Sequence, residues 1–124
     1  MKRVLLVDDS KMTRNMVKMR FPKVEPIAFE IHEADGGKQC LDLYRQAPYD
    51  LVLLDLNMPE MDGFQTLQEL KKLDATARVV ILTADALQKS RDKALELGAA
   101  GVISKPPSKE AIITLLEEHL QIRC

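Results

Sequence analysis

The sequence predicts an α/β domain with a doubly wound parallel sheet, in which strand and helix alternate five times. Short apolar runs bounded by turn residues recur along the chain, as is typical of strands buried on both faces. The segments between them carry apolar residues at helical spacing. Helical crossovers between such strands give a parallel sheet with helices on both faces. The chain of 124 residues has the size of one domain, so residues 1–124 are expected to form one unit.

The first strand is expected at Val4–Val7, where four apolar residues precede two acids. Ser10 is a candidate N-cap for a helix that begins at Lys11 and ends near Pro22. Four residues form the apolar stripe expected on this helix, namely Met12, Met16, Val17 and Met19.

Residues 28–34 alternate apolar and polar side chains, which indicates a strand near a sheet edge. A turn at residues 35–37 opens the second helix, which Pro48 closes. The central strand is predicted at Leu51–Leu54, and Asp62 is a candidate N-cap for the helix after it.

The fourth strand is predicted at Arg78–Leu82 and is followed by a helix from about Ala86 to Leu97, which Gly98 ends. A weaker strand is expected at residues 100–104. Ser108 is the candidate N-cap of a last amphipathic helix that reaches Leu120.

Polar residues stand at the ends of four predicted strands. They are Asp8, Asp9, Asp55, Thr83 and Lys105. In a parallel sheet these ends lie along one edge, where open α/β folds bind their ligands. Three carboxylates brought together repel one another, and a divalent cation relieves this repulsion. Because oxygen atoms are the only ligands nearby, Mg²⁺ fits the site better than zinc.

Asp55 is the best nucleophile among these residues. In the flavodoxin-like strand order it lies between the acid pair on one side and Thr83 and Lys105 on the other. A carboxylate can attack phosphorus to form an acyl phosphate, while Lys105 and Thr83 hold the phosphoryl group. Each residue alone also has an ordinary role as a cap, a turn residue or a solvated lysine. Their joint occurrence in order along the strands favours the site.

Composition excludes several classes of function. A net charge of −1 does not indicate nucleic acid or membrane partners. Five cations form a basic cluster, interpreted as a solvated helix face: Lys11, Arg14, Lys18, Arg20 and Lys23. Cys40 and Cys124 are too far apart for a disulfide framework or a zinc site. No leader or membrane-length apolar run is visible, so a cytoplasmic protein is expected.

The sequence resembles the receiver domain of bacterial two-component response regulators. Four segments carry the resemblance: Val7-Asp8-Asp9-Ser10, the D-x-x-M-P-x-x-D-G string from Asp55 to Gly63, Thr83-Ala84 and Lys105-Pro106. The resemblance covers essentially the whole chain and implies the (βα)5 receiver fold. It also implies that the protein signals rather than turning over an external substrate.

The resemblance assigns metal roles to four residues. Asp9 and Asp55 would bind Mg²⁺ by their side chains, and Asn57 by its backbone carbonyl. Asp8 would assist, mainly through water.

The phosphoryl group has three residues assigned to it by the same resemblance. Asp55 would accept it from a sensor histidine kinase or a histidine phosphotransfer protein. Lys105 would contact it, across a cis bond to Pro106. Thr83 would swing inward to hydrogen-bond a phosphoryl oxygen, and this movement is the switch.

Val102 departs from the family pattern, because a tyrosine or phenylalanine commonly stands three residues before the lysine. An inward swing of that aromatic ring therefore cannot be the output signal. No output domain follows the last helix, so we expect a stand-alone response regulator that binds a downstream protein. By analogy, its docking face would involve residues 86–97 and 108–120.

Three other functions compete with this one. A phosphorelay intermediate would pass the phosphoryl group to a second histidine. A phosphatase with an aspartate nucleophile would need a general acid two residues later, where Asn57 cannot serve. A flavodoxin-like cofactor binder would need a phosphate loop after the first strand, where Asp8 and Asp9 would repel phosphate.

Overall fold

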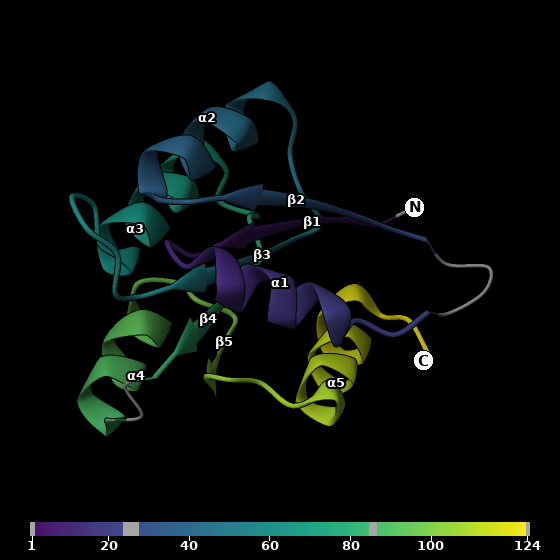
Figure 1. The fold of residues 1–124 in the computed structure, drawn as a ribbon. Helices are drawn as coiled ribbons and strands as arrows, with labels where there is room; N and C mark the ends of the chain where they lie inside the picture. The colour runs from purple at the N-terminus through teal and green to yellow at the C-terminus, as the bar shows by residue number, and fades with distance from the viewer. Residues whose placement is uncertain (1, 24–27, 85–86, 124) are drawn as a thin grey trace.

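The structure is a computed structural model that describes residues 2–23, 28–84 and 87–123. Within these ranges five strands alternate with five helices, as the sequence predicts (Figure 1). The strands are β1 (Lys2–Val7), β2 (Phe29–Ala34), β3 (Leu51–Asp55), β4 (Val79–Thr83) and β5 (Gly101–Ser104). The helices are α1 (Lys11–Met19), α2 (Gly37–Gln46), α3 (Gly63–Leu73), α4 (Gln88–Glu96) and α5 (Lys109–Leu120). None of these helices is long and apolar enough to cross a membrane.

All five strands are parallel, in the order β2–β1–β3–β4–β5. β3 is central and each of its five residues is buried, which explains its continuous apolar run. β2 lies at one edge and is mostly half-buried, as its alternating sequence predicts. From β1 the chain first adds β2 on one side and then crosses back to add β3, β4 and β5 on the other, so a topological switch point lies between β1 and β3.

Helices cover both faces of the sheet and make two apolar cores (Figure 1). On one face, α2, α3 and α4 pack against the strand residues that include Leu5, Val52 and Ile81. On the other face, α1 and α5 pack against the alternate residues, which include Leu6, Leu53 and Leu82. Consecutive side chains of a strand point to opposite faces, so each apolar run supplies both cores.

Side-chain caps begin three of the helices where the sequence predicts them. Ser10 accepts a hydrogen bond from the Thr13 N–H, and Ser108 accepts one from the Ala111 N–H. Asp62 forms a reciprocal capping box with Gln65. For α4, the predicted start at Ala86 lies outside the described residues, and the described helix begins at Gln88.

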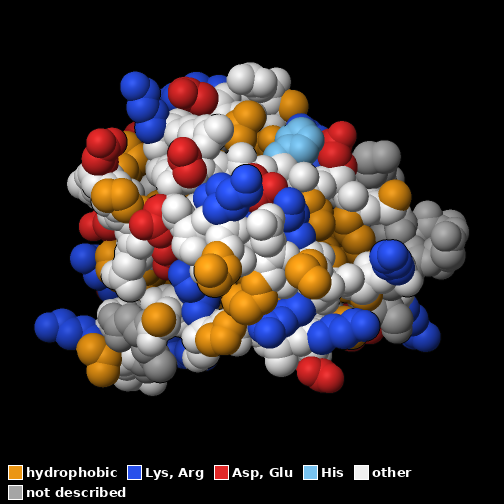
Figure 2. All heavy atoms as spheres, in the orientation of Figure 1, with side chains coloured by type: hydrophobic (Ala, Val, Ile, Leu, Met, Phe, Trp, Pro, Cys, Tyr) orange, Lys and Arg blue, Asp and Glu red, His pale blue; other side chains and the backbone are white. Residues whose placement is uncertain are grey.

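The predicted apolar stripe of α1 is right for Val17 and wrong for Met12 and Met19. Val17 is the only fully buried residue of this helix, whereas Met12 and Met19 are 82% and 85% exposed. Met12, Met16 and Met19 share one helix face, and Val17 lies about 100° around the helix from Met16. Hydrophobic side chains therefore gather on the surface over α1, among lysine and arginine side chains (Figure 2).

Candidate functional site

Four strands bring the predicted site residues together at their carboxyl ends. Asp8 directly follows β1, Asp55 ends β3 and Thr83 ends β4. One carboxylate oxygen from each of Asp8, Asp9 and Asp55 lies within 4.8 Å of the others. Asp8 and Asp55 are buried, whereas Asp9 is exposed. The sheet therefore presents two buried acids and one acid that faces solvent.

Lys105 directly follows β5 and places its ammonium group between the two buried acids. Its Nζ lies 2.8 Å from Oδ2 of Asp8 and 3.3 Å from Oδ1 of Asp55. Its backbone N–H donates to the carbonyl of Thr83 at 2.9 Å, which holds the start of this loop against β4. The Lys105–Pro106 peptide bond is cis, as the family resemblance implies.

Asp8 is held by several groups at once. Its Oδ1 accepts a hydrogen bond from the Ser10 N–H at 2.9 Å, and its own N–H donates to the Ala34 carbonyl at 3.1 Å. Its carbonyl oxygen accepts from Nη1 of Arg14 at 2.5 Å. The exit of β1 is therefore tied to both β2 and α1.

The interpretation of the basic cluster as a solvated face is wrong for three half-buried members, Arg14, Lys18 and Arg20. The side chain of Arg14 is 12% exposed and also binds Glu33, and Nη1 of Arg20 donates to the Pro107 carbonyl at 2.6 Å. Lys11 and Lys23 are exposed, as expected. The sequence offered one signal for Arg14, the acidic Glu33 in the alternating edge strand, but the pairing depends on how α1 lies across the sheet.

The loop after Asp55 turns back against the end of β3. The N–H of Asn57 donates to Oδ1 of Asp55 at 3.3 Å, and the N–H of Gly63 donates to the Leu56 carbonyl at 2.9 Å. A Cβ at position 63 would lie 2.4 Å from the carbonyl oxygen of Asp55. Glycine is therefore required where α3 begins, because only glycine allows this close approach. This structural role was missed in the sequence, although Gly63 stands directly after the N-cap.

Burial and charge shift the acid–base properties of Asp55 and Lys105. Burial raises the pKa of Asp55, and the neighbouring Asp8 carboxylate raises it further against the opposing effect of Lys105. Burial lowers the pKa of Lys105, but the hydrogen bond to Asp8 and the charge of Asp55 outweigh it and leave that pKa raised. Lys105 is thus held as a cation, beside Asp55, whose ionised form is disfavoured by its burial and by Asp8.

The donor set fits a hard divalent cation. Three carboxylates converge, and within the described residues neither cysteine nor histidine belongs to their cluster. Oxygen ligands that carry negative charge suit Mg²⁺, which keeps several waters and uses one or two carboxylates. The acidic pocket is therefore compatible with magnesium.

Thr83 and Val102 occupy different surroundings. Thr83 is 1% exposed at the end of β4, on the same sheet edge as the acids. Val102 lies inside β5, paired with Ile81, and belongs to the core that α4 covers. Thr83 therefore stands at the site, whereas Val102 connects β5 to the packing of α4.

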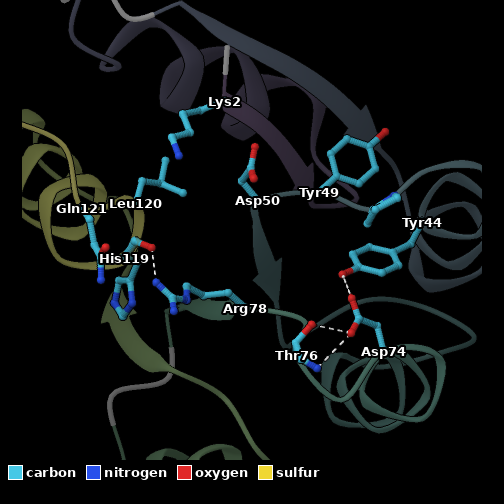
Figure 3. A pocket seen from close by; sticks show the side chains of 11 residues that line it. Lys2, Tyr44, Tyr49, Asp50, Asp74, Thr76, Arg78, His119, Leu120 and Gln121 are labelled. Carbon is cyan, nitrogen blue, oxygen red and sulfur yellow. Dashed lines mark hydrogen bonds between the residues drawn. The ribbon is translucent and has the colours of Figure 1, made fainter.

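A hollow of about 460 Å³ lies at the opposite ends of the strands from the acidic cluster (Figure 3). Asp74 accepts hydrogen bonds there from the hydroxyl of Tyr44 and from Thr76. Arg78 donates to the carbonyl of His119, and Asp50 accepts from the N–H of Arg3. Most of its polar groups thus serve the fold, so this hollow is a weaker candidate than the acidic edge.

The sequence matches the family model described as response regulator receiver domain over residues 4–117. It is 34% identical over 120 residues to the chemotaxis protein CheY of Halobacterium salinarum, covering 96% of this chain and 97% of that protein. It is 35% identical over 119 residues to CheY of Bacillus subtilis, covering 95% and 97%.

Solved structures agree with the sequence comparison. The chemotaxis protein CheY4 of Vibrio cholerae superposes with a TM-score of 0.85 at 26% identity, over 96% of this chain and 98% of that one. A chain of the CheX–CheY complex with BeF3 and Mg²⁺ from Borrelia burgdorferi gives a TM-score of 0.86 at 27% identity, over 98% and 90%.

Proposed function

The chain belongs to the response regulator receiver domain family, and from that membership we propose that Asp55 accepts a phosphoryl group from a phosphohistidine. The chain is a CheY-like receiver domain of two-component signalling. The observation that carries the proposal is the position of Asp55, a buried carboxylate at the end of the central strand between the acid pair and Lys105. Residues 1–124 would form one such domain.

Asp55 supplies the attacking oxygen. Both described interactions of its carboxylate, with the Asn57 N–H and with Lys105, use Oδ1, so we assign Oδ2 as the nucleophile. Oδ2 forms a bond to phosphorus while the bond from phosphorus to the donor imidazole nitrogen breaks. The electron pair of that bond stays on the imidazole, and Asp55 becomes an acyl phosphate. Water later attacks the acyl phosphate, which releases inorganic phosphate and returns the carboxylate.

The acidic cluster would hold Mg²⁺ through Asp9 and Asp55, with the backbone carbonyl of Asn57 as a further ligand. Asp8 would act mainly through water. The bound ion supplies positive charge to the phosphoryl oxygens during transfer. Lys105 already contacts Asp8 and Asp55, and it would donate a hydrogen bond to a phosphoryl oxygen once Asp55 is phosphorylated. The cluster of Asp8, Asp9 and Asp55 supports this arrangement.

The signal passes to a partner protein. Thr83 moves toward the phosphoryl group, and the packing of α4 on β4 and β5 changes with it. Because position 102 is valine, the surface of α4, β5 and α5 changes without a swinging aromatic ring. The Borrelia burgdorferi complex of CheX with CheY supports a protein as a binding partner. The proposed phosphodonor is a sensor histidine kinase or a histidine phosphotransfer protein, in the cytoplasm.

Acetyl phosphate with Mg²⁺ tests the proposal directly. Intact mass spectrometry is expected to show one added phosphoryl group on the wild type, and removal by hydroxylamine would identify an acyl phosphate. Asp55→Asn abolishes the addition, and EDTA stops it in the wild type. Asp42→Asn, which changes an exposed acid on α2, is the matched control and labels normally. Undiminished labelling of Asp55→Asn would refute the nucleophile assignment.

A further inference from the structure

Arg14 joins three parts of the fold near the acid pair. Its Nη1 donates to the carbonyl oxygen of Asp8 at 2.5 Å, and its Nε donates to Oε1 of Glu33 at 2.9 Å. A guanidinium group has its donors in a fixed plane, so one side chain can hold both partners in a set geometry. Arg14 therefore links α1, the exit of β1 and the edge strand β2.

The Asp8 carbonyl matters because it belongs to the peptide unit that leads into Asp9. That unit is planar, so holding its oxygen sets the plane from which Asp9 projects. Asp9 is exposed, and its carboxylate makes no hydrogen bond or ion pair with another described residue, although one of its oxygens lies within 4.8 Å of those of Asp8 and Asp55. Because no hydrogen bond or ion pair holds this carboxylate, the backbone at Asp9 is the part of the fold that sets the direction from which its side chain leaves. A metal ligand of this kind depends strongly on the groups that orient it.

We propose that Arg14 is a positioning residue, which aims Asp9 at the magnesium ion by holding the Asp8–Asp9 peptide plane. This inference rests on the metal role that the proposed function gives to Asp9. The sign of the effect separates positioning from charge. A nearby cation repels Mg²⁺, so loss of the arginine charge alone would tighten binding. Loss of positioning would weaken it.

Isothermal titration of the full chain with MgCl₂ measures this effect. Arg14→Gln is expected to raise the Kd for Mg²⁺ by about tenfold or more. Lys18→Gln is the matched control, because Lys18 lies on the same helix and its Nζ binds Oε2 of Glu33 at 2.7 Å, but its described contacts do not include Asp8. Its Kd is expected to stay within about twofold of the wild type, since this half-buried ion pair makes no described contact with the acids of the site.

A further variant covers the case in which Arg14→Gln does not fold. Arg14→Lys keeps the charge, but a single ammonium group cannot hold the two partners in the same plane. Its Kd is expected to rise by roughly threefold to tenfold. Thermal unfolding in EDTA, followed by circular dichroism, shows whether each variant is folded before titration.

The possible outcomes separate this inference from the proposed function. If folded Arg14→Gln binds Mg²⁺ with the Kd of the wild type, the positioning role is overturned. If only Arg14→Lys folds, the same result in that variant overturns it. An equal rise in Lys18→Gln also overturns it, because the pair with Glu33 would then account for the effect. If the wild type and Asp9→Asn bind Mg²⁺ equally, the proposed metal site itself fails.

Discussion

Nζ of Lys105 lies 2.8 Å from Oδ2 of Asp8, although 97 positions separate the two residues. Because the same ammonium group also contacts Asp55, it neutralises part of the negative charge that a bound cation would otherwise meet. Under the proposed function, Lys105 would therefore oppose metal binding before phosphorylation and stabilise the phosphoryl group afterwards. These two effects have opposite signs and can be measured separately.

Lys105→Met is expected to tighten Mg²⁺ binding and to slow phosphorylation. Removal of the cation leaves the acids more attractive to a divalent ion, so the Kd falls by several-fold. The rate of labelling by acetyl phosphate falls by roughly tenfold or more, since one donor to the phosphoryl oxygens is lost. Calorimetry and timed mass spectrometry measure the two quantities. Lys105→Arg keeps the charge and should bind Mg²⁺ close to normally; equally tight binding in both variants would contradict the charge argument.

Asp55→Asn is expected to stabilise the protein in EDTA at neutral pH. The pKa of Asp55 is raised by burial and by Asp8, so the folded state binds this proton more tightly than the unfolded state. The protonated Asp55 therefore stabilises the folded state at low pH, and this stabilisation is lost as the pH rises through the pKa that Asp55 has in the folded protein. Removing the charge should add on the order of 1 kcal/mol to the free energy of unfolding at pH 7. It should also reduce the loss of stability that the wild type shows as the pH rises.

Urea unfolding at several pH values measures this change. Asp42→Asn provides the control, because this exposed acid lies outside the cluster. A less stable Asp55→Asn protein would show that the buried charge is fully compensated by Lys105 and Asn57 in the wild type.

Thr83→Ala should separate phosphorylation from signalling. Thr83 is buried at the site but is proposed to act on the phosphoryl group only after transfer. Labelling by acetyl phosphate should stay within about threefold of the wild type, since the hydroxyl is not the nucleophile. Chemical-shift changes in α4 and β5 on phosphorylation should shrink, and Thr83→Ser should retain them. Full shift changes in Thr83→Ala would remove the threonine from the switch.

Val102→Ala should affect stability and leave the chemistry intact. Val102 is 8% exposed in the core beneath α4, so losing two methyl groups should cost roughly 1–3 kcal/mol. Phosphoryl incorporation per folded molecule should be unchanged. Urea unfolding and mass spectrometry test the two parts, and a large loss of labelling would mean that the side chain supports the site.

Cys40 should be inert in the folded protein. It is fully buried, and burial raises the pKa of its thiol to about 12, so very little thiolate is present at neutral pH. In a Cys124→Ser variant, which leaves Cys40 as the single thiol, reaction with a disulfide reagent should require unfolding. Rapid reaction without urea, at a rate that exceeds unfolding, would contradict this burial.

Several features of the site could be predicted because they depend on local sequence. The apolar runs determine the strands, and parallel strands place their carboxyl ends on one edge, so Asp8, Asp55 and Thr83 were expected together. The helix starts at Ser10, Asp62 and Ser108 follow from capping hydrogen bonds that span three residues. Such contacts join neighbours in the chain and are visible in the sequence.

Other features depend on how distant elements pack. The methionines of α1 recur at the spacing that a buried helix face would have. Only the packing of the helix on the sheet decides that Val17, and not the methionines, points inward. The sequence around Arg14 indicates a surface cation, whereas the packing of α1 brings its guanidinium to the Asp8 carbonyl and to Glu33. The requirement for glycine at position 63 arises from the carbonyl of Asp55 at the turn.

The sequence by itself therefore determined the order of strands and helices and which acids meet at the sheet edge, because these follow from local periodicity and from the geometry of parallel strands. Only the tertiary structure decided how those acids are held. The orientation of Asp8 and the placement of Lys105 depend on hydrogen bonds and ion pairs between elements, several of them far apart in the chain. Such contacts are directional and leave no periodic pattern in the sequence.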